Sequence, residues 1–120
     1  MFSLLFYKVM HLVGLFIAFM GLAGLILAAA MGADKKAKRP AIIFHGIGLT
    51  LALIGGFGLA ARLGIVTVLP GWIHAKIAIW LILGMLPIVI KRQPKSGTLI
   101  WFVAPFLGFL AAYFGVYKPF

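Results

Sequence analysis

Three histidines and one lysine lie within otherwise apolar stretches of the chain, where a polar side chain is costly and usually has a function. They are His11, His45, His74 and Lys76. A neutral imidazole ring is a good ligand for haem iron, zinc or copper. The 120 residues include no cysteine and a single acidic residue, Asp34. Disulfides, thiolate metal sites and ion transport through a membrane-buried carboxylate are therefore excluded.

The elements that position these side chains are four apolar stretches, each long enough to cross a bilayer. They cover about residues 4–31, 41–63, 72–90 and 98–117. Hydrophobic residues make up 65% of the chain and the mean hydropathy is +1.22, which is too apolar for a soluble domain of this size. The long polar–apolar alternation of a membrane barrel is missing. We predict one all-α domain over residues 1–120, an integral membrane four-helix bundle with antiparallel, up-down topology.

The net charge of +10 is concentrated in two short connections between the apolar stretches. Seven of the eleven basic residues lie in Gly32–Pro40 and Lys91–Gly97. Basic loops of membrane proteins stay on the cytoplasmic side. This pattern explains the charge without nucleic-acid binding and places both termini, with the Gly64–Gly71 connection, on the outer, periplasmic side of a bacterial inner membrane. Pro40 is expected in the first turn of the second helix.

An eleven-residue pattern occurs twice, at residues 11–21 and 45–55, with His, Gly, Leu, Ala and Gly recurring at five of the eleven positions. At about 100° per residue, the shared His, Gly, Ala and Gly fall on one helix face. Small residues let membrane helices approach closely, so we predict that the glycines serve helix packing. A face without bulky side chains also accepts a flat ligand.

Depth in the bilayer determines which of the polar side chains can cooperate. At 1.5 Å per residue, His11 lies roughly 10 Å, and His74 and Lys76 roughly 3–6 Å, from the same membrane face. His45 lies in the other leaflet. Residues two apart on a helix point about 200° apart, so His74 and Lys76 cannot both face one pocket. The face of Lys76 continues through Trp80, Leu83 and Pro87, and that of His74 through Ile77, Leu81 and Gly84.

Haem b suits this distribution better than a bare metal ion. Zinc needs three or four close ligands and copper(I) favours grouped methionines, whereas the methionines here are scattered. Haem needs one or two axial ligands, a flat apolar slot and cations for its propionates. We predict His11 as an axial iron ligand, with His74, Lys76 or His45 as the second and His74 as its natural partner by depth. The cations at the level expected for propionates are Lys8, Arg62 and Lys76.

Two motifs carry a resemblance to a known family. The bacterial membrane protoporphyrinogen IX oxidases of the HemJ type have a first-span pattern Lys-x-x-His…Gly, which Tyr7-Lys8-Val9-Met10-His11 followed by Gly21 resembles. Their Trp-Leu-His-x-Lys-Leu motif is similar to Gly71-Trp72-Ile73-His74-Ala75-Lys76-Ile77. CopD-like copper-resistance membrane domains share the general design. The resemblance covers roughly residues 5–92 and implies a four-helix protein that holds haem b, with His11 and Lys76 tied to haem binding and activity.

Two classes of function follow from these observations. The first is a b-type haem membrane protein with a redox role, an oxidoreductase if it is catalytic, which oxidises a porphyrinogen or passes electrons to a quinone. The second is an accessory or scaffold subunit of a larger membrane complex without its own cofactor, or a carrier of copper or a small solute. The glycine-rich faces also permit a homo-oligomer. An absorption spectrum of the oxidised and reduced protein distinguishes the two classes.

Overall fold

The computed structural model describes residues 2–120, which fold into four α-helices and one short 3₁₀ helix. These are α1 (Leu4–Ala30), α2 (Lys35–Arg62), α3 (Gly71–Arg92), η1 (Pro94–Ser96) and α4 (Gly97–Tyr117). No strand occurs in this range, so the predicted all-α class is confirmed. Each of the four α-helices is long and apolar enough to cross a membrane.

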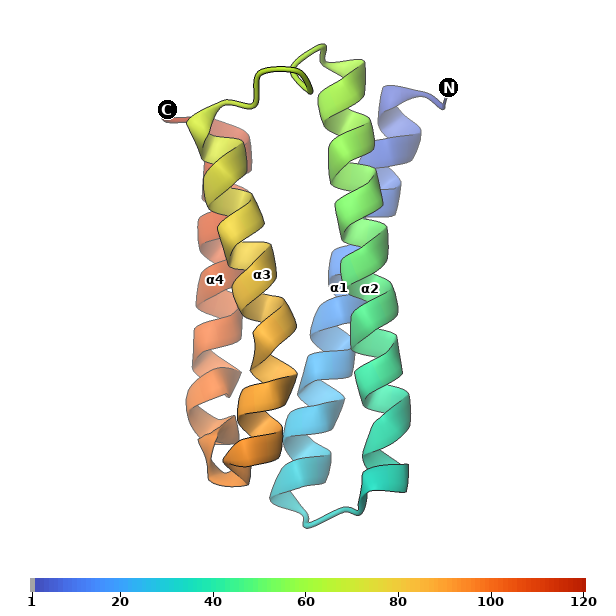
Figure 1. The fold of residues 1–120 in the computed structure, drawn as a ribbon, viewed down its shortest axis with the longest axis vertical. Helices are drawn as coiled ribbons and strands as arrows, with labels where there is room; N and C mark the ends of the chain where they lie inside the picture. The colour runs from blue at the N-terminus through green and yellow to red at the C-terminus, as the bar shows by residue number, and fades with distance from the viewer. Residues whose placement is uncertain (1) are drawn as a thin grey trace.

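The connections lie at two opposite ends of an elongated molecule (Figure 1). The α1–α2 connection and η1 share one end, which we call the basic end because four basic residues in the first turns of α2 and three from the end of α3 through η1 gather there. Both chain ends and the connection over residues 64–70 share the other end, which we call the terminal end (Figure 1). His11 and Lys76 lie toward the terminal end, one on α1 and the other on α3.

Helix α2 begins six residues earlier than the sequence predicts. Asp34 is its N-cap, and the Asp34 Oδ1 atom accepts a hydrogen bond of 2.8 Å from the amide of Ala37. This cap satisfies one of the free amides of the first turn and lets the helix start in the basic segment. The expectation for Pro40 was therefore wrong, because Pro40 lies inside the helix rather than in its first turn. Its missing N–H removes only the bond to the carbonyl of Lys36, in a part of the helix that is exposed.

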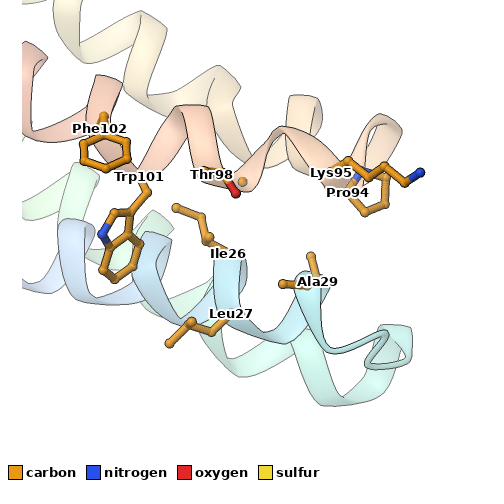
Figure 2. Close-up of a pocket in the computed structure, with 10 residues that line it drawn as sticks. Ile26, Leu27, Ala29, Pro94, Lys95, Thr98, Trp101 and Phe102 are labelled. Carbon is orange, nitrogen blue, oxygen red and sulfur yellow. The ribbon is translucent and has the colours of Figure 1, made fainter.

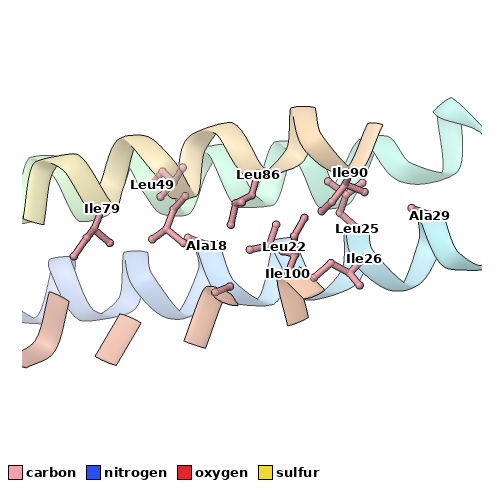
Figure 3. Packing of buried hydrophobic residues seen from close by; sticks show 12 residues of the cluster. Ala18, Leu22, Leu25, Ile26, Ala29, Leu49, Ile79, Leu86, Ile90 and Ile100 are labelled. Carbon is pink, nitrogen blue, oxygen red and sulfur yellow. The ribbon is translucent and has the colours of Figure 1, made fainter. Parts of the chain in front are cut away.

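The buried core, seen from close by in Figure 3, runs from about the middle of the bundle toward the basic end. Helix α3 contributes buried residues only from Ile79 onward, and those of α4 end at Ala104. The first two turns of α3 therefore take no part in the core, and α1 and α3 lie farther apart at the terminal end than at the basic end (Figure 1). The core comprises Ala18, Leu22, Leu25, Ile26, Ala29, Leu49, Ile79, Leu83, Leu86, Ile90, Ile100 and Ala104.

The last residues of the chain fasten α3 to α4 at the terminal end. The amide of Trp72 donates to the carbonyl of Phe120 over 3.1 Å, and the Lys118 ammonium lies 5.6 Å from the centre of the Trp72 ring. Lys118 adopts a left-handed conformation, with φ of 49°, which ends α4 and turns the chain toward α3. The Phe120 ring packs on Gly71, where an added Cβ would lie 2.6 Å from it. These contacts hold the start of α3 next to the end of α4.

Candidate functional site

The two copies of the eleven-residue pattern pack against each other, one on α1 and one on α2, in opposite directions. A Cβ added at Gly55 would lie 2.6 Å from the His11 amide nitrogen, and one added at Gly21 would lie 2.5 Å from the amide nitrogen of His45. The first residue of each copy thus contacts the last residue of the other. Gly14 and Gly48, in the middle, are equally close to backbone atoms of the facing helix. The packing role predicted for the glycines is confirmed, and the pair has a local two-fold relation.

Both histidines of the repeat use the same ring nitrogen to bridge the two helices. The Nδ1 atom of His11 lies 2.7 Å from the carbonyl oxygen of Ala52, and the Nδ1 atom of His45 lies 2.7 Å from that of Ala18. A carbonyl oxygen only accepts, so the Nδ1 nitrogen in each bond is assigned as the donor. Each carbonyl has a second lone pair for this purpose beside the one used inside its own helix.

The second ring nitrogen breaks the symmetry. The Nε2 atom of His45 lies 3.0 Å from the carbonyl oxygen of Leu83 on α3, and His45 is only 3% exposed. Only a doubly protonated ring donates through both nitrogens, while a neutral ring donates to one of the two carbonyls. In either state, no lone pair of His45 faces open space. His45 therefore joins three helices.

The Nε2 atom of His11 has no hydrogen-bond partner among residues 2–120. Every buried side-chain nitrogen and oxygen in these residues has a partner, so the Nε2 atom of the half-buried His11 is not itself enclosed. With its hydrogen on Nδ1, the ring presents a free lone pair on Nε2. Of the two equivalent histidines, only His11 can accept a ligand.

Trp80, which the sequence placed on the Lys76 face but to which it assigned no role, helps to hold α3 in place. The Trp80 Nε1 nitrogen donates to the carbonyl of Leu49 on α2 over 2.9 Å. Leu49 lies one turn beyond His45 on α2, so α2 and α3 share two hydrogen bonds along one contact line. The signal was available in the sequence, because Trp80 lies in the middle of an apolar span, far from the interfacial level where tryptophan is common. An indole N–H at that depth needs an acceptor.

His74 and Lys76 face different surroundings, as their spacing predicts. His74 is exposed, and its Nδ1 atom lies 3.2 Å from the carbonyl of Pro70 at the start of its own helix. Lys76 is half-buried, and its ammonium nitrogen would lie 2.8 Å from a Cβ added at Gly115 on α4. The Lys76 side chain therefore packs between α3 and α4 at the terminal end, whereas His74 is exposed.

The remaining cations expected near a ligand lie on the outside of the terminal end. Lys8 lies one turn before His11 on α1, and Arg62 is the last residue of α2. Both side chains are exposed. The structure thus gathers His11, Lys76, Lys8 and Arg62 at the terminal end, and places His45 apart from them within the core contacts.

The chemistry of His11 fits an axial ligand to haem iron. Histidines that bind a metal commonly donate their other ring N–H to a backbone carbonyl, which fixes the tautomer and orients the ring. The Ala52 carbonyl does this for His11. His45 does not fit the same role, because both of its nitrogens are engaged. His74 has the right chemistry but lies on the outer face of α3.

Neither metal-ligand clustering nor similarity to known proteins adds to this picture. Within residues 2–120, no group of three or more His, Cys, Asp or Glu side chains is arranged to hold a metal ion. Comparison of the chain with protein-family models, with curated proteins and with solved structures gave no match. The functional assignment therefore depends on the geometry of the residues themselves.

Proposed function

We propose that this chain is an integral membrane protein that binds haem b through His11 and has a redox role. The observation that carries the proposal is the asymmetry between two equivalent histidines. His11 and His45 make the same Nδ1 bond across the α1–α2 contact, but only His11 keeps Nε2 free. A histidine in an apolar span with one nitrogen held and the other open has the form of a metal ligand.

The surrounding charges support the same assignment. Lys76 on α3, Lys8 on α1 and Arg62 on α2 all lie at the same end of the bundle as His11. Haem propionates are anionic, and cations near the membrane surface would stabilise them. These positions also agree with the resemblance to the HemJ-type protoporphyrinogen IX oxidases, in which the lysine matching Lys76 is tied to haem binding. We therefore propose Lys76 as the second residue of the site.

The proposed arrangement in the membrane follows the charges of the loops. The basic end would face the cytoplasm and the terminal end the periplasm of a bacterial inner membrane, with four antiparallel spans. His11 would then lie in the outer half of the bilayer. The first two turns of α3 lie outside the buried core, so α3 packs less closely near His11 than it does near His45.

The contributions of the chain can be separated from those of the cofactor. Bound haem would supply one-electron chemistry at its iron. The Ala52 carbonyl holds the His11 ring and fixes its tautomer, so the lone pair stays on Nε2. The apolar surroundings would lower the local dielectric, and Lys76, Lys8 and Arg62 would balance negative charge. The physiological electron partner would be a porphyrinogen or a quinone.

Absorption spectroscopy with two matched variants tests the proposal. The protein is expressed with ample haem, purified in mild detergent, and scanned oxidised and reduced. We expect a Soret band in the wild type, its loss in His11→Ala, and its retention in His74→Ala, which removes the same ring from an exposed position. Far-UV circular dichroism verifies that each variant is helical. A colourless wild type, or a Soret band unchanged in a folded His11→Ala variant, would overturn the assignment.

A second candidate function is an accessory subunit without a cofactor, favoured by the outer face of α4. Four exposed aromatic side chains follow one another along this face, with successive ring centres 6.3, 6.4 and 4.8 Å apart. Aromatic residues are enriched where proteins bind one another. Two results together would support this alternative. The protein would be recovered in mild detergent as a stable complex without cofactor absorbance, and the Phe106→Ala/Phe109→Ala variant would no longer form that complex. The four residues are Phe106, Phe109, Tyr113 and Tyr117.

A further inference from the structure

A small groove opens at the basic end, where α1, α2 and α3 meet. It encloses about 260 Å³. Buried Leu25 and Ile90 form its floor, and exposed Ile42 and Ile88 extend along its walls. Its lining also includes Pro87 and three lysines, Lys35, Lys38 and Lys91.

The three lysines converge on the groove from two helices. Lys35 and Lys38 are three residues apart and so lie on the same side of α2, and Lys91 reaches the groove from α3. The only acidic residue in the chain, Asp34, caps α2 through its Oδ1 atom. Lys35 and Lys38 also lie in the first turn of α2, where the helix dipole disfavours cations. An anion in this place would be stabilised by the lysines and by the helix start together.

We propose that this groove binds an anionic phospholipid, with the phosphate headgroup among Lys35, Lys38 and Lys91 and one acyl chain along the apolar walls. Basic pockets between membrane helices on the cytoplasmic side are known to bind such headgroups. The inference rests on the membrane location proposed above, and it is independent of haem, because the groove and His11 lie at opposite ends of the bundle.

The shape of the groove favours a lipid over a free phosphate ion. Pockets that enclose a whole small molecule usually measure about 300–1,000 Å³, so this groove is too small for most of them. It suits part of a longer molecule that continues into the bilayer. Its apolar floor and walls give a free phosphate nothing to contact beyond the lysines at the rim.

A second groove at the same end provides a natural comparison. It lies between α1 and the start of α4, encloses about 630 Å³, and is lined by Ile26, Leu27, Trp101 and Phe102 (Figure 2). Lys95 is its only charged residue. Acyl chains of any lipid can contact this larger groove, but a single lysine gives it no selectivity for an anionic headgroup.

Loop lysines also gather on the cytoplasmic side simply to set the orientation of the protein in the membrane. The experiment must therefore distinguish the effect of lysines that line the groove from the effect of positive charge elsewhere at the same end. The groove variant is Lys35→Gln, Lys38→Gln and Lys91→Gln. The matched control is Lys36→Gln, Arg39→Gln and Arg92→Gln, which removes the same three charges from exposed positions at the same end that do not line the groove. Both variants lower the general attraction to anionic membranes equally.

Native mass spectrometry of the full chain, titrated with dioleoyl-phosphatidylglycerol or dioleoyl-phosphatidylcholine, measures the binding. The general attraction cancels between the two variants, and a direct hydrogen bond to a charged group contributes on the order of ten-fold to affinity, so we expect the groove variant to bind phosphatidylglycerol on the order of ten-fold or more weakly than the control. Phosphatidylcholine binding should be weak and equal in both. Equal phosphatidylglycerol affinities in the two variants would overturn the proposal.

Two further measurements test the acyl-chain contact and the membrane location. Ile42→Trp keeps every charge but fills the groove, so it should weaken phosphatidylglycerol binding as well. If glycerol 3-phosphate, which has the headgroup phosphate without acyl chains, competes as well as the lipid, the lipid assignment fails. Release of the protein from membranes by alkaline carbonate would refute the membrane location itself, whereas retention combined with equal affinities refutes the groove alone.

Discussion

The close contact between α1 and α2 predicts that a glycine-to-alanine substitution in α2 has opposite effects on stability at two nearby positions. A Cβ added at Gly48 would lie 2.6 Å from the carbonyl oxygen of Gly14 and 2.7 Å from the Cα of Ala18, and both are backbone atoms that cannot rotate away. At Gly46, two residues earlier on the same helix, an added Cβ meets nothing within 4 Å. Gly48→Ala should therefore destabilise the protein, while Gly46→Ala should stabilise it.

The expected magnitudes follow from these contacts. Carbon atoms in contact ordinarily lie about 3.5–4.0 Å apart, so Gly48→Ala must separate the helices by on the order of 1 Å. Overpacking of this kind costs about 1–3 kcal/mol. The separation also stretches the 2.7 Å bonds of His11 and His45, each contributing about 0.6 kcal/mol in a membrane helix pair. Against this, replacing glycine by alanine in a helix contributes about 0.5–1 kcal/mol of stability, and this is all that Gly46→Ala should show.

The assay is reversible unfolding in mixed micelles, titrated with sodium dodecyl sulfate and followed by far-UV circular dichroism. We expect the unfolding free energy of Gly48→Ala to lie about 1–4 kcal/mol below that of Gly46→Ala, from the overpacking and the two stretched histidine bonds, because the gain in helix propensity is common to both variants and cancels. Gly14→Ala should resemble Gly48→Ala, and the double variant should cost less than the two combined, because each added methyl opens the same contact. Equal stability of Gly48→Ala and Gly46→Ala would refute the packing described for the repeat.

Two other contacts make testable predictions in the same assay. Trp80→Phe removes the hydrogen bond to Leu49 and should lower the unfolding free energy by about 0.6 kcal/mol. His45→Phe removes the hydrogen bonds to α1 and α3 and should lower it by about 1 kcal/mol or more. If the effects of the two substitutions are additive in the double variant, the two side chains do not hold α3 cooperatively. Asp34→Ala removes the N-cap of α2 and should lower the unfolding free energy by about 1 kcal/mol. Backbone chemical shifts should show a loss of helical structure around Lys35. Unchanged shifts there would contradict the role of the cap.

Helix number and approximate span limits were predictable because apolar run length alone determines them. The sequence placed the first span at residues 4–31, and α1 covers Leu4–Ala30. The limits of α2 were not predictable in the same way. A span was expected to begin where the charges stop, but the Asp34 cap starts the helix among the charges. Helix limits depend on backbone hydrogen bonds, and bilayer thickness sets only the apolar part.

The candidate site was predictable in part for a similar reason. Helical periodicity separates His74 from Lys76, and the structure places them on different faces. The repeat also predicts that α1 and α2 pack through small residues. Neither pattern says which carbonyl each histidine would reach, because that depends on the register of one helix against another. The two copies of the repeat are alike in sequence, so the different hydrogen bonding of the His11 and His45 rings could not be derived from them.

The position of α3 turns a symmetric helix pair into one with two different ends. Inverted repeats in membrane proteins give equivalent positions in opposite halves of the bilayer, so the α1–α2 pair alone would treat its two histidines alike. Helix α3 packs into the core only from Ile79 onward, and its Leu83 carbonyl therefore meets His45. Its earlier turns do not pack in this way, so nothing on α3 caps the Nε2 atom of His11. If the proposed haem site is correct, the docking of α3 should therefore affect the environment of His11. A Trp80→Phe/His45→Phe variant, which loosens this docking while His11 is intact, should then shift the Soret band without abolishing it, and an unchanged band would contradict this link.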